Sequence, residues 1–271
     1  MAIINRTPDS FFDRGATFCD DAAHEAVDRA VAEGADIIDV GGVKAGPGPQ
    51  VTPEEEIRRV VPFVGEVRDR HPDVVISVDT WRSQVAEAAC RDGADLLNDA
   101  WGGFDPHLAA VAAEHKAGIV CTHTGGQAPR TRPYHPQYAD LVGDIVARTT
   151  ALADRALRLG VPRESILIDP GHDFGKVTRQ SLLATRATDK IVATGWPVLM
   201  SLSRKDFVGE SLGLTDPADR LVGTLAATAI TAWLGARVWR THDVAATRQT
   251  LDMIACIKGD RSPEVELRGL G

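Results

Sequence analysis

The stretch Val74-Val75-Ile76-Ser77-Val78-Asp79 contains the pattern that decides the fold: an apolar run that ends in a polar or charged residue. The same pattern recurs along the chain, with a helix-like segment between one apolar run and the next. A strand buried on both faces has no use for polar groups at one end only, whereas a binding pocket does. If the strands are parallel and close into a barrel, all of these ends meet at one mouth. The other polar ends are Asn5, Asp39, Asn98-Asp99, His123, Asp169, Ser203-Arg204-Lys205, and Arg240 with His242 and Asp243.

Eight strand–helix units follow one another, mostly with short connections. This alternation predicts a parallel sheet. The number of units, and a length of 271 residues near the roughly 250 typical of the fold, favour a single-domain α/β protein, a (β/α)8 TIM barrel, over an open doubly wound sheet. No linker divides the chain, so we predict one domain over residues 1–271. The predicted strands are 2–4, 35–40, 74–78, 95–97, 119–121, 166–168, 198–202 and 237–239, and the predicted helices are 20–33, 53–70, 82–91, 106–116, 137–159, 178–193, 218–234 and 245–258.

Composition and charge exclude several classes of protein. The formal net charge is −8, the pI is about 5.5, and no block of like charges stands out, so nucleic-acid binding is not expected. No apolar run approaches the roughly 18 residues of a membrane span, and the first residues lack a signal-peptide pattern. The four cysteines form no Cys-x-x-Cys pair and predict free thiols in a reducing compartment. We therefore expect a cytoplasmic protein with no membrane partner.

The loop that follows the second predicted strand is rich in glycine and proline. Its sequence, Gly41-Gly42-Val43-Lys44-Ala45-Gly46-Pro47-Gly48-Pro49, matches neither the dinucleotide fingerprint nor the P-loop. The segment after it, Thr52-Pro53-Glu54-Glu55, is typical of a helix start, with Thr52 as the N-cap and Pro53 at the first helical position.

Three strand-end side chains, Asp79, Asn98 and Asp169, suggest a binding site for a planar heterocycle. Any one of them alone is more typical of a helix N-cap. Together with Lys205 at one barrel mouth they offer carboxylates for ring N–H groups, and an amide and an amine for carbonyls and ring nitrogens.

Cationic residues follow the last two predicted strands, where this fold often binds phosphate. They are Arg204, Lys205, Arg240 and His242, and surface salt bridges are the alternative interpretation. For His123 and His172, a structural hydrogen bond and a ligand role remain equally open.

In these residues the chain resembles dihydropteroate synthase, within the pterin-binding barrel group that also includes methyltetrahydrofolate methyltransferases. The matching segments span nearly the whole chain in the family's order and are specific only jointly. They are Asn5-Arg6-Thr7-Pro8-Asp9-Ser10-Phe11, Asp39-Val40-Gly41-Gly42, Ser77-Val78-Asp79-Thr80, Leu97-Asn98-Asp99, Asp169-Pro170-Gly171-His172-Asp173-Phe174-Gly175-Lys176, Ser203-Arg204-Lys205 and Arg240-Thr241-His242-Asp243.

The resemblance implies two small-molecule substrates, a hydroxymethyl-dihydropterin pyrophosphate and p-aminobenzoate, and commonly a homodimer. In such enzymes the C–O bond breaks first, Mg²⁺ and cations stabilise the leaving pyrophosphate, and the amine attacks the methylene. Carried over by position, catalysis would rest on Lys205, Arg240 and His242. The pterin would contact Asp79, Asn98, Asp169 and Lys205. The pyrophosphate would contact Asn5, Arg240 and His242, and Mg²⁺ would bind Asn5. The pocket for the second substrate would contain Phe174, Ser203 and Pro47.

One loop departs from the family pattern. Where the family usually has Glu-Ser-Thr-Arg, this chain has Val43-Lys44-Ala45-Gly46, and the Thr and Arg are the side chains that close over pyrophosphate and aminobenzoate. An arginine that stabilises phosphate in a transition state can contribute roughly 10³–10⁵ in rate. Arg6 in place of Val, His172 in place of Phe and Thr124 in place of Met are smaller departures.

Two functions follow from the resemblance and this departure. The first is a dihydropteroate synthase-like transferase of folate biosynthesis with weak or altered activity. The alternative is a catalytically inactive paralogue that binds a pterin or related ligand without forming dihydropteroate. A non-catalytic pterin-binding or regulatory protein is a third candidate. Methyl transfer to a corrinoid partner is less favoured, because Ser203-Arg204-Lys205 follows the synthase pattern more closely.

Overall fold

The computed structural model describes residues 1–7, 17, 19–131 and 137–268. Part of the predicted motif 5–11 and the end of the predicted loop 122–135 therefore lie outside the described residues. The strands are β1 Ala2–Asn5, β2 Ile37–Gly41, β3 Val75–Asp79, β4 Leu96–Asp99, β5 Gly118–Thr122, β6 Ile166–Asp169, β7 Leu199–Met200 and β8 Val238–Trp239. The helices are α1 Asp20–Ala32, α2 Pro53–Arg70, α3 Ser83–Arg91, α4 Leu108–Glu114, α5 Leu141–Leu159, α6 Thr178–Arg186, α7 Thr188–Val192, α8 Asp206–Leu212, α9 Leu221–Trp233 and α10 Val244–Lys258, with 3-10 turns at Arg163–Ser165 and Pro217–Arg220.

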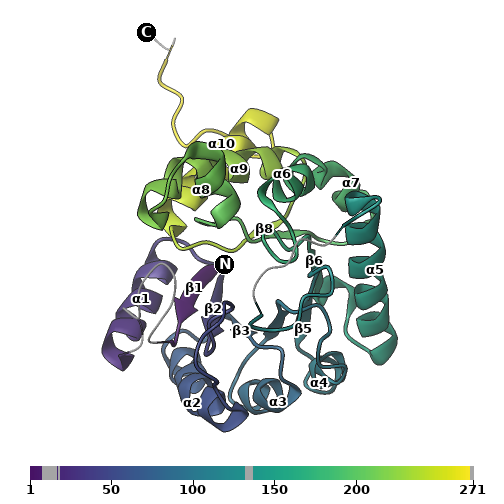
Figure 1. The fold of residues 1–271 in the computed structure, drawn as a ribbon. Helices are drawn as coiled ribbons and strands as arrows, with labels where there is room; N and C mark the ends of the chain where they lie inside the picture. Colours follow the sequence, from purple (N-terminus) through teal and green to yellow (C-terminus); the bar gives the residue numbers. More distant parts are fainter. Residues whose placement is uncertain (8–16, 18, 132–136, 269–271) are drawn as a thin grey trace.

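The strands form a closed parallel barrel surrounded by helices (Figure 1). Strands β1 to β6 pair in sequence order, and β7 pairs with β8. Single bridges join these two sheets, one between Ile168 and Val198 and one between Ala2 and Thr241. The predicted single α/β unit with a TIM-barrel fold is confirmed.

The barrel interior changes from apolar to polar along the strands. One apolar layer contains inward side chains of several strands: Met1, Ile37, Leu96, Val120, Leu167, Leu199 and Val238. Because successive inward positions are two residues apart, the next layer toward the strand ends contains Asp39, Asn98, Thr122, Asp169 and Arg240. The polar strand ends are thus the second inward layer of the barrel, which is why they face one another.

The helix prediction is right in its main elements and differs in detail. Thr52 caps α2 as expected, with the Glu55 N–H donating to its Oγ1 at 3.2 Å. The predicted helix 178–193 is two helices, α6 and α7, which meet at Ala187. The predicted strand 198–202 forms a strand at Leu199–Met200, preceded by the single bridge of Val198 to Ile168, and the short helix α8 after it was not predicted.

Candidate functional site

Asp39, at the inward face of β2, lies at the centre of the polar layer. It is completely buried. Its carboxylate accepts hydrogen bonds from Ser77 Oγ at 2.6 Å, Asn98 Nδ2 at 3.2 Å and Arg240 Nε at 2.6 Å. The strand register brings them together, since Asp39 lies opposite Ser77. No site role was predicted for Asp39, although it ends an apolar run just as Asp79 does.

Arg240 joins two carboxylates from neighbouring strands. Besides Asp39, its guanidinium contacts Asp79, to which Nη2 donates at 2.9 Å. Burial raises the pKa of the Asp79 carboxyl to about 7, with Arg240 opposing the rise and Asp39 adding to it. The guanidinium is therefore already paired with two carboxylates before any anionic ligand arrives. The name floor is used below for Asp39, Ser77, Asp79, Asn98, Asp169 and Arg240.

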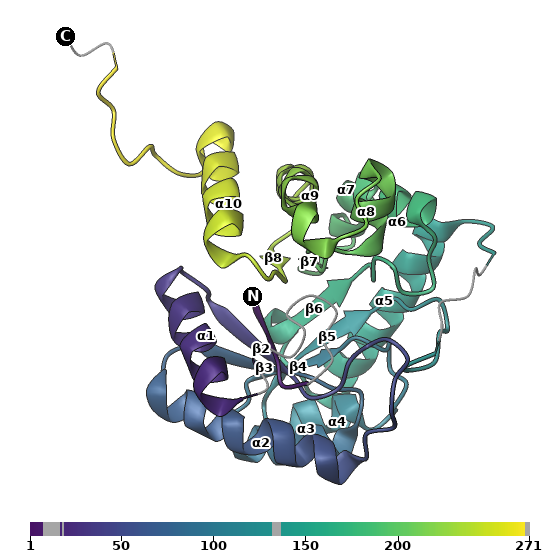
Figure 2. The same cartoon turned by 60° about the vertical axis from the view of Figure 1, so that its left-hand side comes forward.

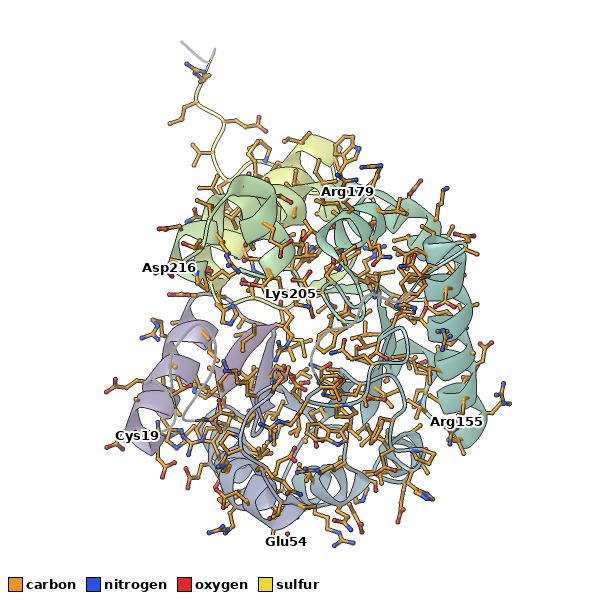
Figure 3. The ribbon with its side chains drawn as sticks, in the orientation of Figure 1. Cys19, Glu54, Arg155, Arg179, Lys205 and Asp216 are labelled. Carbon is orange, nitrogen blue, oxygen red and sulfur yellow. The ribbon has the colours of Figure 1, made fainter. Side chains whose placement is uncertain are left out.

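Asp169 and Lys205 come together through the turn that follows β6. Asp169 Oδ1 accepts from the Gly171 N–H at 2.7 Å. Gly171 has φ +65, and a Cβ there would lie 2.0 Å from the carbonyl oxygen of His123, so only glycine fits. The turn presents the His172 carbonyl oxygen to Lys205 Nζ at 2.7 Å. Figure 3 shows Lys205 near the centre of the ring of helices, whereas Cys19, Glu54 and Arg155 lie at its periphery.

A cavity of about 410 Å³, called here the side cavity, lies beside Lys205. Phe174 lines it and makes an edge contact with Trp101, with ring centroids 5.0 Å apart. Lys205 Nζ lies 5.0 Å from the centroid of the Phe174 ring. Of the predicted second-substrate residues, Phe174 and Pro47 line this cavity. Its lining includes Gly46, Pro47, Trp101, Phe174, Lys205 and Arg220.

Ser203, the third residue predicted for that pocket, is instead bonded to His242. Its Oγ lies 3.0 Å from His242 Nδ1 and accepts the backbone N–H of His242 at 3.2 Å. Burial lowers the pKa of His242 to about 3, and Arg240 adds to this. The imidazole is therefore uncharged at neutral pH and can offer an anion a hydrogen bond but no charge.

Residues 42–51, called here the rim loop, are positioned mainly through their backbone. Gly42 packs against α2 so closely that a Cβ would lie 2.6 Å from Val60. Arginines from three other segments hold the carbonyl groups of the loop. Arg59 donates to Gly42 O at 3.1 Å, Arg82 to Val51 O at 2.7 Å, and Arg130 to Pro49 O at 2.6 Å.

Arg204 does not serve as a cation for a ligand. Its buried guanidinium forms two hydrogen bonds with Asp243, at 2.8 and 2.7 Å, and donates to the carbonyl oxygens of Pro217 and Ala218. The expectation that Arg204 adds positive character to the mouth is therefore wrong. Arg204 forms a salt bridge, but a buried one rather than the surface pair given as the alternative.

His123 and His172 both have structural hydrogen bonds. His123 lies between Asp144, 2.8 Å from Nε2, and Lys176, 2.7 Å from Nδ1. Lys176, for which no role was predicted, is buried and also donates to three backbone carbonyl groups around the β6 turn. His172 is completely buried and bonds Thr185 Oγ1 at 2.9 Å. Both histidines stabilise the turn rather than face a ligand.

Oxygen donors suitable for Mg²⁺ lie at the ends of β1 and β3. Asn5 Oδ1 and Asp79 Oδ2 are 3.9 and 4.0 Å from the position that a Cβ would take on Gly41, so they flank the same point. Among the described residues no group of three or more His, Cys, Asp or Glu could hold a metal ion. Mg²⁺ often binds one or two protein oxygens together with substrate phosphates. The donors fit an ion that arrives with a phosphate ligand.

Comparisons with known proteins agree with this geometry. A family model described as "Pterin binding enzyme" matches residues 1–242. "Inactive dihydropteroate synthase 2" of Mycobacterium tuberculosis is 59% identical over 274 residues, covering 100% of this chain and 86% of the relative. "Dihydropteroate synthase" of Synechocystis is 39% identical over 92% of this chain and 86% of the relative. The crystal structure of Yersinia pestis dihydropteroate synthase with a sulfonamide drug complex superposes with a TM-score of 0.90 at 32% identity, covering 96% of this chain and 94% of that one.

Proposed function

This chain belongs to the dihydropteroate synthase family, and we propose that it is a catalytically inactive paralogue that binds a pterin without forming dihydropteroate. The family resemblance inferred from the sequence is confirmed. Of the two functions that the sequence left open, the identity to synthases named inactive favours the second over a transferase with weak or altered activity.

One observation carries the proposal: a polar floor lies beside an anion site that has little charge to offer. Asp79, Asn98, Asp169 and Lys205 lie around one mouth and would contact the pterin. At the expected pyrophosphate position, Arg240 is already paired with two carboxylates and His242 is uncharged. A leaving pyrophosphate needs compensating positive charge as the C–O bond breaks.

The rim loop adds to this deficit. Ala45 and Gly46 line the side cavity without a hydrogen-bonding side chain. Mg²⁺ held between Asn5 and the ligand phosphates would supply positive charge. We propose that this ion binds only together with a phosphate ligand, because the protein offers few oxygens of its own.

The test separates binding from reaction. Purified protein is mixed with hydroxymethyl-dihydropterin pyrophosphate, Mg²⁺ and labelled p-aminobenzoate, and pterin binding is followed separately by fluorescence. We expect pterin binding in the micromolar range and no labelled dihydropteroate above a protein-free control. Asp169→Asn should weaken pterin binding, whereas Asp36→Asn, at an exposed position, should not. Formation of dihydropteroate at an ordinary enzyme rate would refute the proposal that the protein is inactive. Absence of pterin binding would refute the proposal that its ligand is a pterin.

We also propose that two copies pair through α9 and α10, which lie side by side (Figure 2). Both helices expose large apolar side chains, and 54% of Trp233 is accessible. Contiguous exposed apolar surface marks an interaction site. Light scattering should give twice the chain mass, and Trp233→Glu should give a monomer; a monomeric parent protein would contradict the proposal. The exposed apolar residues are Val222, Ile230, Trp233, Met253 and Ile257.

We propose a cytoplasmic location from two observations. Within the described ranges, no helix is long and apolar enough to cross a membrane. All four cysteines are free thiols, which fits a reducing compartment. Fractionation of cells that express a tagged copy would test the location, and recovery outside the cytoplasm would contradict it.

A further inference from the structure

Lys176 directly follows the turn after β6, residues 170–175, called here the β6 turn. It is buried, with 5% of its surface exposed. Its Nζ donates to the carbonyl oxygens of Gly171 at 2.9 Å, Phe174 at 3.0 Å and His123 at 3.2 Å. His123 Nδ1 lies 2.7 Å away. Four polar atoms therefore converge on one amine, and two of them belong to the β6 turn itself.

These surroundings suit the protonated form of the amine. The carbonyl oxygens can only accept, and His123 accepts at Nδ1 when its Nε2–H donates to Asp144 at 2.8 Å. Burial lowers the pKa of His123 to about 4, and Lys176 adds to this, so the imidazole is neutral at neutral pH. An ammonium group has three N–H donors, whereas a neutral amine has two and turns a lone pair toward an acceptor. Loss of the proton from Lys176 therefore breaks at least one of these bonds.

Burial works against the charge that the acceptors require. It lowers the pKa of Lys176 to about 7, and Lys205, just after β7, adds to the fall. Three carboxylates oppose the fall: Asp169 on β6, Asp173 in the β6 turn and Asp144 on α5. The amine can therefore gain or lose its proton within the physiological pH range.

The β6 turn brings two groups to the barrel mouth. The His172 carbonyl oxygen accepts from Lys205 Nζ at 2.7 Å, and the Phe174 ring lines the side cavity, 5.0 Å from the same Nζ. Between them, Asp173 has φ +67, a conformation that a residue with a side chain seldom adopts. Such a backbone persists only where surrounding bonds hold it, and the bonds from Lys176 to the turn are of this kind.

We propose that Lys176 is a positioning residue, whose protonated amine holds the β6 turn in the shape that places Lys205 and Phe174 for a ligand. The inference rests on the proposed function, because the ligand affected is the pterin that Lys205 would contact. Loss of the proton releases a carbonyl group of the turn and loosens it. Pterin affinity should therefore fall as the pH rises through neutrality.

The same proton has the opposite effect on folding stability. The pKa of a lysine in an unfolded chain is roughly 10.4, so above pH 7 the unfolded state holds a proton that the folded state has lost. The contribution of Lys176 to the free energy of unfolding therefore rises with pH while pterin affinity falls. Partial unfolding at high pH would lower both, so the two measurements together identify the role of the amine.

The experiment compares the parent protein with Lys176→Met, which keeps a similar side-chain length and removes the charge and the donors. Lys190→Met is the matched control, because Lys190 is exposed on α7. In fluorescence titrations the parent protein should bind pterin at least about tenfold more tightly than Lys176→Met at pH 6, and about equally at pH 9. Lys190→Met should match the parent protein at both pH values.

An affinity ratio between the parent protein and Lys176→Met that stays the same at both pH values would overturn the inference, because a merely structural role gives the same loss at every pH. In urea, the difference in free energy of unfolding between these two proteins, parent minus variant, should rise from pH 7 to pH 9. A difference that stays constant or falls would also overturn it.

A measurement without ligand separates this inference from the proposed function. In nuclear magnetic resonance spectra of the parent protein, the amide signals of Gly171 and Gly175 should shift together with a midpoint near pH 7, and Lys176→Met should lose this midpoint. Absence of the midpoint in the parent protein would overturn the inference, even if Lys176→Met does not fold. Failure of the parent protein to bind pterin at pH 6 would refute the proposed function, and the amide midpoint would still decide whether Lys176 controls the turn.

Discussion

The floor and the rim loop of the same barrel mouth are held in place by different means. The floor is held by its own side chains, since Asp39 alone accepts bonds from β3, from β4 and from Arg240 just after β8. The rim loop is held by its backbone carbonyl groups, to which Arg59, Arg82 and Arg130 donate. Floor side chains are therefore part of what stabilises the barrel, whereas rim side chains can change without loss of the fold.

This difference explains how binding and reaction can separate in one family. A buried charge network resists substitution because removal of one partner leaves the other uncompensated. Ala45 and Gly46 have no side-chain group that could join a buried charge network, so these residues can occupy the rim loop with little loss of folding stability. A paralogue can thus keep the pterin floor for reasons of stability alone and lose the groups that the reaction requires.

The largest expected effect comes from Asp39→Asn, which breaks the floor. The substitution keeps the shape of the side chain but removes the charge that pairs with Arg240 at 2.6 Å in a completely buried position. Loss of one partner of a buried ion pair costs about 3–5 kcal/mol. We expect the free energy of unfolding in urea to fall by this amount, together with pterin affinity.

The matched control changes the same residue type at an exposed position just before the same strand. Asp36 is 76% exposed and pairs with Arg248, so Asp36→Asn should cost less than about 1 kcal/mol. Similar losses in the two variants would mean that the floor contributes no more to stability than an ordinary surface pair. The contrast drawn between floor and rim would then fail.

The sequence predicts the floor better than the rim because strand geometry is periodic. Once Ile37 is an inward residue, Asp39 is inward as well, and parallel pairing sets it beside Ser77. The ring of polar ends therefore follows from pattern alone. The central role of Asp39 does not, because a pattern places a side chain without saying how many partners it meets.

Loop partners depend on contacts between distant segments, which no local pattern encodes. Arg130 reaches Pro49 across 81 residues of sequence. Arg204 and Lys205 are adjacent and both cationic, yet one is bonded to Asp243 and the other points toward the barrel centre. Likewise, the charge state of His242 depends on burial and on Arg240, and neither can be read from the motif.

The smallest expected effect is the contribution of His242 to the pH dependence of the free energy of unfolding. It concerns the side of the mouth where Arg240 and His242 mark the expected pyrophosphate position, called here the anion side. Its pKa of about 3 in the folded protein lies below the roughly 6.5 of an unfolded chain. Below about pH 6.5 the unfolded state gains a proton that the folded state cannot hold, so this contribution to stability is present at neutral pH and lost on acidification. From about pH 7 to about pH 5, the parent protein should therefore lose about 1–2 kcal/mol more unfolding free energy than His242→Gln.

Burial and the Arg240 guanidinium both lower the pKa of His242 and so set the sign of that difference. Because each protein is compared with itself at two pH values, a loss of stability that the substitution causes at neutral pH cancels. Nuclear magnetic resonance gives a second readout. The imidazole signal of His242 is identified as the one that is missing from the spectrum of His242→Gln. In the parent protein this signal should keep the chemical shift of a neutral imidazole from about pH 8 to about pH 5. A ring that gains its proton near pH 6 would carry charge close to Arg240, and the anion side would then be a stronger phosphate site than the inactive assignment allows. Ser203 Oγ lies 3.0 Å from Nδ1 of the His242 ring. If burial keeps the imidazole neutral, its chemical shift in Ser203→Ala should stay that of a neutral ring. A shift toward that of a protonated ring in this variant would mean that the hydroxyl group keeps the ring neutral.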